Sequence, residues 1–370
     1  MNFVMLARCT AMGCRIAVIL LLACCSRAGA MEAVQLSPDG KSFMLATSGK
    51  RFVPWGFNYD HDEKGRLLED YWLTEWSKVE EDFREMKDLG ANVVRIHLQF
   101  GQFMETADLP RAAALQQLAR LLTLAERIGL HLDLTGLGCY HQADVPAWYA
   151  ALTEPARWSA QANFWAAIAQ QCQGSPAVFC YDLMNEPVVA GAKRQAGAWL
   201  GPAFGGKHFV QFITLDPAGR VAPTVAGEWI VLLKRAIRRH DAKHLVTVGL
   251  VDWSLDRPGL RSGFVPEQIA AHLDFLCVHL YPKSGEVPQA LATLRGFDVG
   301  KPVVIEETFP LQAGLPEFGR FLTESRAVAT GWLGFYWGKT PAELRQANTI
   351  ADAIMLGWLE FFQQEGANAR

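Results

Sequence analysis

The feature of this sequence that most limits its fold is a strict alternation of short apolar runs with longer amphipathic stretches. Strand-like runs occupy residues 52–59, 93–98, 130–134, 178–184, 245–250, 275–280, 302–305 and 333–337. Helix-like stretches follow them in turn, at residues 77–89, 111–128, 160–171, 224–240, 266–272, 288–294, 317–329 and 349–364. Such alternation is typical of one parallel sheet with helices packed outside it, so the sequence predicts an α/β protein.

Eight repeats are enough to close a parallel sheet, and no shift of composition divides the 370 residues. We therefore expect a single (β/α)8 TIM barrel. A β-hairpin should precede it, because Ser37-Pro38-Asp39-Gly40 forms a turn signal between apolar flanks. An open doubly wound sheet is the alternative, but no glycine-rich phosphate turn follows an early strand. Residues 188–221 fit neither a helix nor a strand, and we expect a long loop after the fourth strand.

The first thirty residues have the pattern of a targeting segment. Arg8 and Arg15 precede an apolar run at 16–23 that is too short to span a bilayer, and small residues follow at 28–30. We interpret 1–30 as a signal peptide and 31–370 as the barrel domain of a secreted or periplasmic protein. A second interpretation is a lipoprotein signal, in which Cys24 carries the lipid and provides the one contact with a membrane.

The charge balance argues against polyanionic partners. The chain has 35 Lys and Arg against 38 Asp and Glu, a formal net charge of -3. Cleavage after residue 30 would remove three Arg and no acid, which changes that charge to -6. Nucleic acid is therefore not an expected partner, and we expect a monomer.

The cysteines outside the leader show no metal-binding spacing. They are Cys139, Cys172, Cys180 and Cys277, without a CxxC pair, so structural zinc is not expected. One disulfide is possible in an oxidising compartment, although Cys180 and Cys277 lie in apolar runs where buried free thiols are common. No metal or nucleotide motif occurs, so we expect no cofactor.

Polar side chains concentrate where the apolar runs end, and loops that follow barrel strands build active sites. Glu186 ends the fourth run and Glu307 the seventh, so the two carboxylates should face each other across the barrel mouth. Glycoside hydrolysis uses such a pair, one as acid and one at the anomeric carbon. The remaining strand-end residues are Arg95, His97, Asn185, His279, Tyr281, Glu306 and Trp337.

Several motifs resemble those of glycoside hydrolase family 5, the cellulase and mannanase family of clan A, in the family's order. They are Gly90-Ala91-Asn92-Val93-Val94-Arg95, Asn185-Glu186-Pro187, His279-Leu280-Tyr281, Lys301-Pro302-Val303-Val304-Ile305-Glu306-Glu307 and Phe335-Tyr336-Trp337. The resemblance implies a retaining mechanism, with Glu186 as acid/base and Glu307 as nucleophile. Because neighbouring strand residues point to opposite faces, only one of Glu306 and Glu307 can act, and Glu306 is the second choice.

The same resemblance implies the supporting residues. Arg95 would keep the nucleophile ionised, Asn185 would contact the sugar 2-hydroxyl, His279 and Tyr281 would orient the carboxylates, and Trp337 would lie beneath the sugar. The place where the family carries a His at the end of the third strand holds Thr135 here, and His141 in the following loop is the expected substitute.

Other candidates for substrate contact are Asn58 and His61 after the first strand, with His208 in the 188–221 loop as a weaker one. Trp55, Trp72, Trp148, Trp199 and Trp253 are candidates for sugar stacking. The expected substrate is a β-linked oligo- or polysaccharide of glucan or mannan type. Two alternatives stay open: a transglycosylase on the same barrel, and an inactive carbohydrate-binding barrel.

Overall fold

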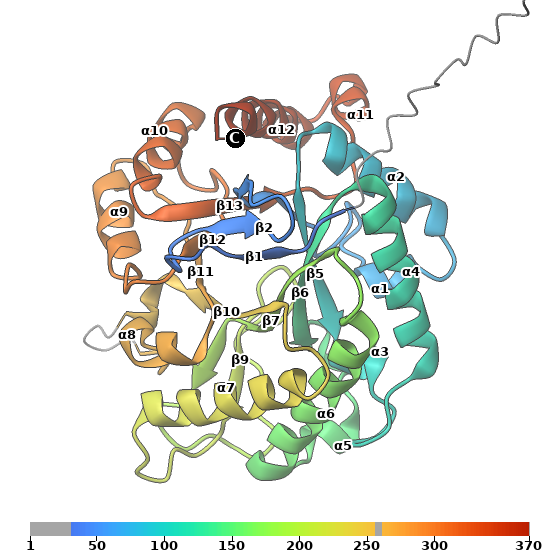
Figure 1. Ribbon diagram of the computed structural model, residues 1–370, viewed down its shortest axis with the longest axis vertical. Coiled ribbons are helices and arrows are strands. Elements are labelled where there is room, and N and C mark those ends of the chain that lie inside the picture. Colours follow the sequence, from blue (N-terminus) through green and yellow to red (C-terminus); the bar gives the residue numbers. More distant parts are fainter. Residues whose placement is uncertain (1–30, 256–260, 370) are drawn as a thin grey trace, which may run out of the picture. The chain divides into compact units, whose positions relative to one another are not determined.

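The computed structural model describes residues 31–255 and 261–369 (Figure 1). The proposed leader at 1–30, with Cys24, lies outside the described residues. None of the helices in these ranges combines the length and apolar character needed to cross a membrane.

Parallel strands close into a barrel at the centre of the fold, which confirms the predicted (β/α)8 architecture (Figure 1). The barrel strands are Trp55–Asn58 (β4), Val93–Gln99 (β5), His131–Gly138 (β6), Val178–Asn185 (β7), Leu245–Val251 (β10), Leu276–His279 (β11), Val303–Glu307 (β12) and Ala329–Phe335 (β13). Each strand pairs with the next along the chain, and β13 pairs with β4 to close the ring.

Helices surround the barrel (Figure 1). The longer ones are Trp76–Asp88 (α2), Ala112–Ile128 (α4), Glu154–Cys172 (α6), Ala222–Arg238 (α7), Val287–Arg295 (α9), Leu315–Ser325 (α10) and Ile350–Ala369 (α12). Short helices lie at Leu68–Tyr71 (α1), Phe100–Phe103 (α3), Ala147–Ala150 (α5), Pro266–Ile269 (α8) and Pro341–Gln346 (α11), and 3₁₀ turns at Gln142–Asp144, Asp252–Ser254 and Ala270–His272.

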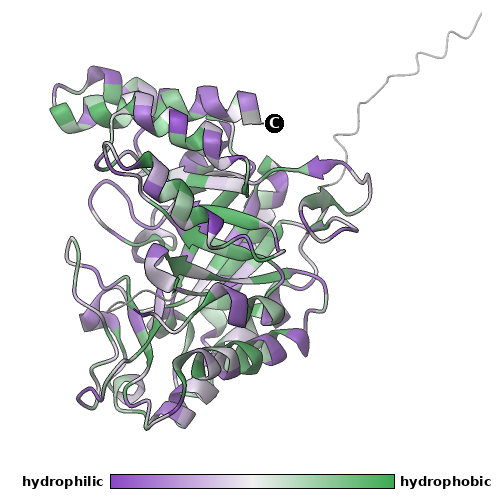
Figure 2. Cartoon of the chain, turned by 90° about the vertical axis from the view of Figure 1, so that its left-hand side faces the viewer, coloured by the Kyte–Doolittle hydropathy of each residue, from purple (hydrophilic) through white to green (hydrophobic). Residues whose placement is uncertain are grey.

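The helices pack through apolar stripes. In α4, Leu118, Leu121, Leu122 and Ala125 are buried at the spacing of one helix face. The helix ends where Gly129 takes a left-handed conformation, φ 77°. The barrel strands are mainly apolar, whereas the outer helices alternate polar and apolar residues (Figure 2). All residues of β7 are buried, as expected for a parallel strand covered on both faces.

A small antiparallel sheet covers the bottom of the barrel. The predicted hairpin joins Val34–Leu36 (β1) to Phe43–Leu45 (β2), and Arg51–Phe52 (β3) adds a third strand. The Phe43 ring packs edge-on against Phe179 and Phe275, with centroids 5.2 and 5.1 Å away. Those two rings lie at the amino ends of β7 and β11, so this sheet is opposite the end at which active sites form.

Three expectations about element boundaries were wrong. The run at 52–59 is divided between β3 and β4, and the last strand begins at Ala329, where a helix was expected. The first residues of β13 are too small to form an apolar run, so the start of this strand was not predicted. Glycine is needed at position 331, because a Cβ on Gly331 would lie 2.8 Å from Pro54. The segment 188–221 contains strand residues, since Pro187–Val189 (β8) pairs in parallel with Gln211–Thr214 (β9). Cys139, Cys172, Cys180 and Cys277 are buried free thiols.

Candidate active site

Two carboxylates meet at the carboxyl end of the barrel. Glu186 lies between β7 and β8, where its backbone turns left-handed (φ 46°) and its N–H donates to the Gly249 carbonyl at 2.9 Å. A non-glycine residue in this conformation is strained by about 1–3 kcal/mol, and such strain is common at functional sites. Glu307 ends β12. One carboxylate oxygen of each lies within 4.8 Å of the other.

Glu307 is held as an anion. Arg95 Nη1 donates to its Oε1 at 2.6 Å, and the Tyr281 hydroxyl donates to its Oε2 at 2.6 Å. Burial raises the pKa of Glu307, but the positive charges of His279 and Arg95 and the Tyr281 hydrogen bond outweigh it, so the net shift is downward. The carboxylate is therefore ionised near neutral pH.

His279 connects the two carboxylates to a third one. Its Nδ1 lies 2.9 Å from Glu186 Oε1 and 3.5 Å from Glu307 Oε2, and its Nε2 lies 3.2 Å from Glu306 Oε2. Burial lowers the pKa of His279, but the charge of Glu307 and the hydrogen bonds to Glu186 and Glu306 raise it to about 10. The ring is thus an imidazolium at neutral pH that donates from both nitrogens.

Glu306 points away from the mouth, into the barrel interior. It is fully buried, and its Oε2 lies 3.4 Å from Arg95 Nη2. Burial raises the pKa of Glu306, but the charges of Arg95 and His279 lower it to about 2. A Cβ on Gly249 would lie within 3.0 Å of Glu306, Arg95 and His279 atoms, so only glycine leaves room for their convergence. Of the two acids in the motif, Glu307 faces the mouth.

Below the pair, Arg95 is the centre of a buried hydrogen-bond network. Its guanidinium donates to Thr135, Asn58, Asp182 and Asn185 at 2.7–2.9 Å. Thr135, at the place where the family carries His, also donates to Asp182 Oδ2 at 2.8 Å. This position therefore supports the arginine instead of facing the mouth.

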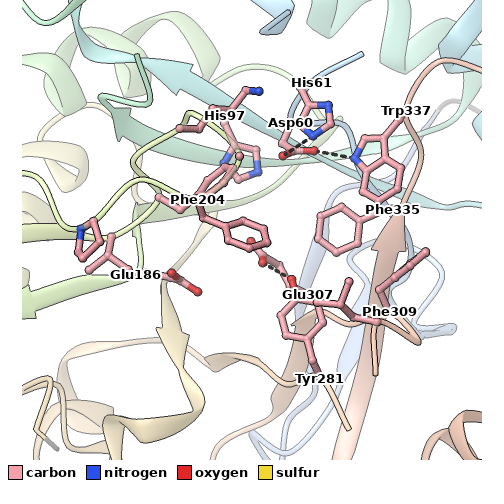
Figure 3. Close-up of a pocket in the computed structure, with 16 residues that line it drawn as sticks. Asp60, His61, His97, Glu186, Phe204, Tyr281, Glu307, Phe309, Phe335 and Trp337 are labelled. Atoms are coloured by element: carbon pink, nitrogen blue, oxygen red, sulfur yellow. Dashed lines mark hydrogen bonds and ion pairs between the residues drawn. The ribbon is translucent and has the colours of Figure 1, made fainter. Parts of the chain in front are cut away.

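A cavity of about 370 Å³ lies over the carboxylates (Figure 3). Its lining is Asp60, His61, His97, Glu186, Pro202, Phe204, Gly205, Lys207, Phe209, Val210, Tyr281, Glu307, Phe309, Leu311, Phe335 and Trp337. Two large apolar side chains are exposed there, Phe204 at 73% and Leu311 at 58%. The walls are thus mainly apolar, with the acids between them.

The residues proposed from sequence fall into three groups. Glu186, Glu307, Tyr281, Trp337 and His61 line the cavity. Behind it lie Arg95, Asn185, His279 and Asn58. The amide of Asn58 donates to the Glu306 and Gly334 carbonyls at 2.8 and 3.0 Å, and that of Asn185 to the Phe209 carbonyl at 3.1 Å.

Two of the loop histidines expected near the sugar lie elsewhere. His141 does not line the cavity, and His208 Nδ1 is 2.8 Å from the Gly201 carbonyl. Among the five candidate stacking tryptophans, Trp55, Trp72, Trp148, Trp199 and Trp253, none lines this cavity.

His97, at the end of the second run, occupies the cavity wall instead of His141. Its Nδ1 hydrogen-bonds the Tyr140 hydroxyl, and its buried Nε2 has no protein partner. Burial and the Arg95 charge lower the pKa of His97 well below its ordinary value, so the ring is neutral. The sequence shows that His97 ends a strand, but it does not show that one ring nitrogen lacks a protein partner.

Asp60 was not identified from sequence. It is 7% exposed, and burial raises its pKa, with the Glu307 charge acting in the same direction and His61 opposing. Nothing local distinguishes Tyr59-Asp60-His61-Asp62 from an ordinary polar turn.

Within the described residues, two clusters have their side-chain oxygen and nitrogen atoms close enough together to hold a metal ion. One is Glu186, His279 and Glu307, and the other, deeper in the barrel, is Asp133, Asp182 and Glu306. In the first, both nitrogens of His279 are used as donors to carboxylates. In the second, the Arg95 guanidinium already contacts Asp182 and Glu306 at 2.9 and 3.4 Å. In each group a protonated side chain takes the place of a cation.

A (β/α)8 barrel with facing carboxylates after its fourth and seventh strands defines the class as glycoside hydrolase. Residues 57–308 match the family model described as "Cellulase (glycosyl hydrolase family 5)". The chain belongs to glycoside hydrolase family 5. Among curated protein sequences, none matches it.

Solved structures with similar folds include β-mannan-degrading enzymes. The exo-β-1,4-mannosidase Op5Man5 from Opitutaceae bacterium strain TAV5 is 18% identical with a TM-score of 0.63, covering 90% of this chain, which spans 63% of that protein. The endo-1,4-β-mannanase from Rhizomucor miehei is 19% identical (TM-score 0.61, 91% of this chain, 100% of that one). A variant of GH5_18 from Streptomyces cattleya, in complex with Manβ1-4GlcNAc, is 19% identical (TM-score 0.58, 76% and 70%). At these identities the likeness concerns the fold.

Proposed function

We propose that the protein is a retaining β-glycosidase that acts by double displacement on a β-linked glycan of mannan or glucan type. The observation that carries the proposal is the separation of the two carboxylates, whose nearest oxygens lie within 4.8 Å. Retaining enzymes place their carboxyl groups about 5–5.5 Å apart, whereas inverting enzymes leave about 6.5–9.5 Å for a water molecule.

Glu307 is the nucleophile in this proposal. It is ionised by Arg95 and oriented by Tyr281, which together occupy both of its oxygens. Glu186 donates a proton to the leaving oxygen as the C1–O bond breaks and the Glu307–C1 bond forms. The carboxylate then present on Glu186 is stabilised by the His279 Nδ1–H at 2.9 Å.

The second displacement reverses these roles. Formation of the glycosyl ester removes the charge of Glu307, and Glu186 takes a proton from water as the water oxygen attacks C1. Product and free Glu307 result, with net retention at C1. Because His279 lies within 3.5 Å of both acids, its positive charge can stabilise whichever of the two is ionised.

Mannose-containing glycans are the favoured substrates, since the proteins of similar structure include an exo-β-1,4-mannosidase and β-mannanases. The proposal also includes a monomeric state and one of two leader functions: export by the segment 1–30 or lipidation at Cys24. The mass of the mature protein from its host would distinguish export from lipidation.

The test is to trap the intermediate. The protein is incubated with 2-deoxy-2-fluoro aryl β-mannoside and β-glucoside, and the intact mass is measured. We expect a mass increase of one fluorosugar, and peptide mapping should locate it on Glu307. Hydrolysis without a trapped ester, or with inverted product, would overturn the retaining assignment; product analysis with added sugar acceptor reports transglycosylation.

A further inference from the structure

Asp60 is a buried carboxyl group at the cavity wall. It follows β4, is 7% exposed, and its Oδ1 accepts from Trp337 Nε1 at 3.3 Å. Its Oδ2 lies 3.8 Å from His61 Nε2, beyond hydrogen-bond distance. Because Asp60 lines the cavity, Oδ2 is placed to accept a hydrogen bond from a ligand there.

His61 offers a second acceptor beside it. Its Nδ1 lies 2.8 Å from the Asp62 carbonyl, which can only accept, so Nδ1 carries the hydrogen. In the neutral ring Nε2 is therefore an acceptor. The ring is parallel to Trp337, with an interplanar angle of 2° and centroids 5.6 Å apart, and both rings line the cavity.

These acceptors lie on the glycone side of the catalytic pair. The acid/base is next to the leaving oxygen, so the leaving group occupies the Glu186 side. Figure 3 shows Asp60, His61 and Trp337 together, with Glu307 between them and Glu186. The sugar that becomes attached to Glu307 therefore extends toward Asp60.

We propose that Asp60 accepts a hydrogen bond from the 4-hydroxyl, and His61 from the 3-hydroxyl, of a terminal glycone sugar, so that the enzyme releases single sugars from the non-reducing end. This rests on the proposed function above. With C1 at Glu307, the 2-hydroxyl lies beside the reacting pair, and the 3,4-diol is the remaining vicinal pair of a pyranose. With a neutral His61 ring, both protein groups are acceptors and need two donors.

The same chemistry excludes a glycan that continues from O4 of the glycone sugar. In a β-1,4-linked chain, O4 of an internal sugar is an ether oxygen that cannot donate. An internal sugar would leave one acceptor unpaired, and sites built to bind a hydroxyl discriminate strongly against ligands that lack it. Only the terminal sugar satisfies both.

The test compares the parent aryl β-glycoside with its 4-deoxy analogue, for the wild type, Asp60→Ala and Asp60→Asn. For the wild type, removal of the 4-hydroxyl should lower kcat/KM by about 10- to 150-fold, the range for a hydrogen bond to a charged group. In Asp60→Ala the same comparison should change kcat/KM by less than about threefold, because the acceptor is gone.

Glu63→Gln is the matched control, since Glu63 is in the same loop, pairs with Lys339 at 3.2 Å and does not line the cavity. It should retain the wild-type preference. Equal discrimination by the wild type and both Asp60 variants would overturn the inference, as would internal cleavage of borohydride-reduced mannohexaose. No hydrolysis of any aryl β-glycoside by the wild type would instead refute the proposed function itself.

Discussion

His279 Nε2 lies 3.2 Å from Glu306 Oε2, and this contact adds to the Glu307 charge and the Glu186 hydrogen bond in raising the pKa of the ring that serves both catalytic carboxylates. Glu306 is the first acid of the Glu306-Glu307 pair, and the alternation of side chains along the strand turns it inward, away from the substrate side. Its anion supports the imidazolium from the rear, while Glu186 and Glu307 face its other nitrogen.

Glu306→Gln should therefore lower the pKa of His279 below its wild-type value. A group whose folded pKa is raised contributes stability that is complete below its unfolded pKa, about 6.5, and is lost as pH rises toward the folded value, here about 10. The wild type should lose this contribution between those values, and the variant over a narrower, lower window. Urea unfolding at several pH values measures the difference.

Exposed Glu267→Gln is the control for that comparison and should follow the wild-type curve. Glu306→Gln should also lose kcat/KM more steeply than the wild type above pH 7, because a neutral His279 ring supports the ionised Glu186 less well. Parallel stability curves for Glu306→Gln and wild type would contradict the role given to Glu306.

Glu186→Ala and Glu307→Ala should each lower kcat by about 10²–10⁴-fold or more, since each removes a reacting group. Azide, a small nucleophile, should restore activity to Glu307→Ala and give a glycosyl azide of inverted configuration. Both are measured by aryl glycoside hydrolysis and product NMR, with thermal unfolding to show that the variants fold. Rescue of Glu306→Ala in place of Glu307→Ala would reverse the assignment of the nucleophile.

The sequence was informative where function coincides with a strand end. Glu186 and Glu307 could be located because each directly ends an apolar run, and the closure of eight strands then requires them to meet. The same reasoning failed for β13, whose first residues are too small to form an apolar run, and for β8 and β9, which lie outside the barrel repeat.

Contacts between distant segments were not predictable. Asp60 is defined as a binding group by Trp337, 277 residues away, and by its burial. The family pattern directed attention to His141 because Thr135 stands where the family carries His, yet His97 on β5 lines the cavity and His141 does not. Side-chain direction, which sequence alone does not show, decided between them.

Tyr281→Phe should raise the pKa of Glu307, because it removes the 2.6 Å hydrogen bond to Oε2. Activity requires ionised Glu307, whose depressed pKa keeps it charged at acidic pH. The acid limb of the kcat/KM profile should therefore move upward by about one pH unit, with about a tenfold lower plateau. Tyr149→Phe, whose hydroxyl contacts buried Gln161 outside the cavity, is the control and should leave the limb in place.

Phe204 should act on the leaving group, because it is 73% exposed at the cavity mouth and contributes apolar surface without a reacting atom. For alkyl β-glycosides of increasing chain length, each methylene buried against it contributes at most about 0.8 kcal/mol, a fourfold gain in kcat/KM. Phe204→Ala should flatten this dependence and raise KM while kcat changes by less than about twofold. Ile350→Ala, 83% exposed but outside the cavity, should keep the wild-type slope. An unchanged slope in Phe204→Ala would show that the leaving group takes another path.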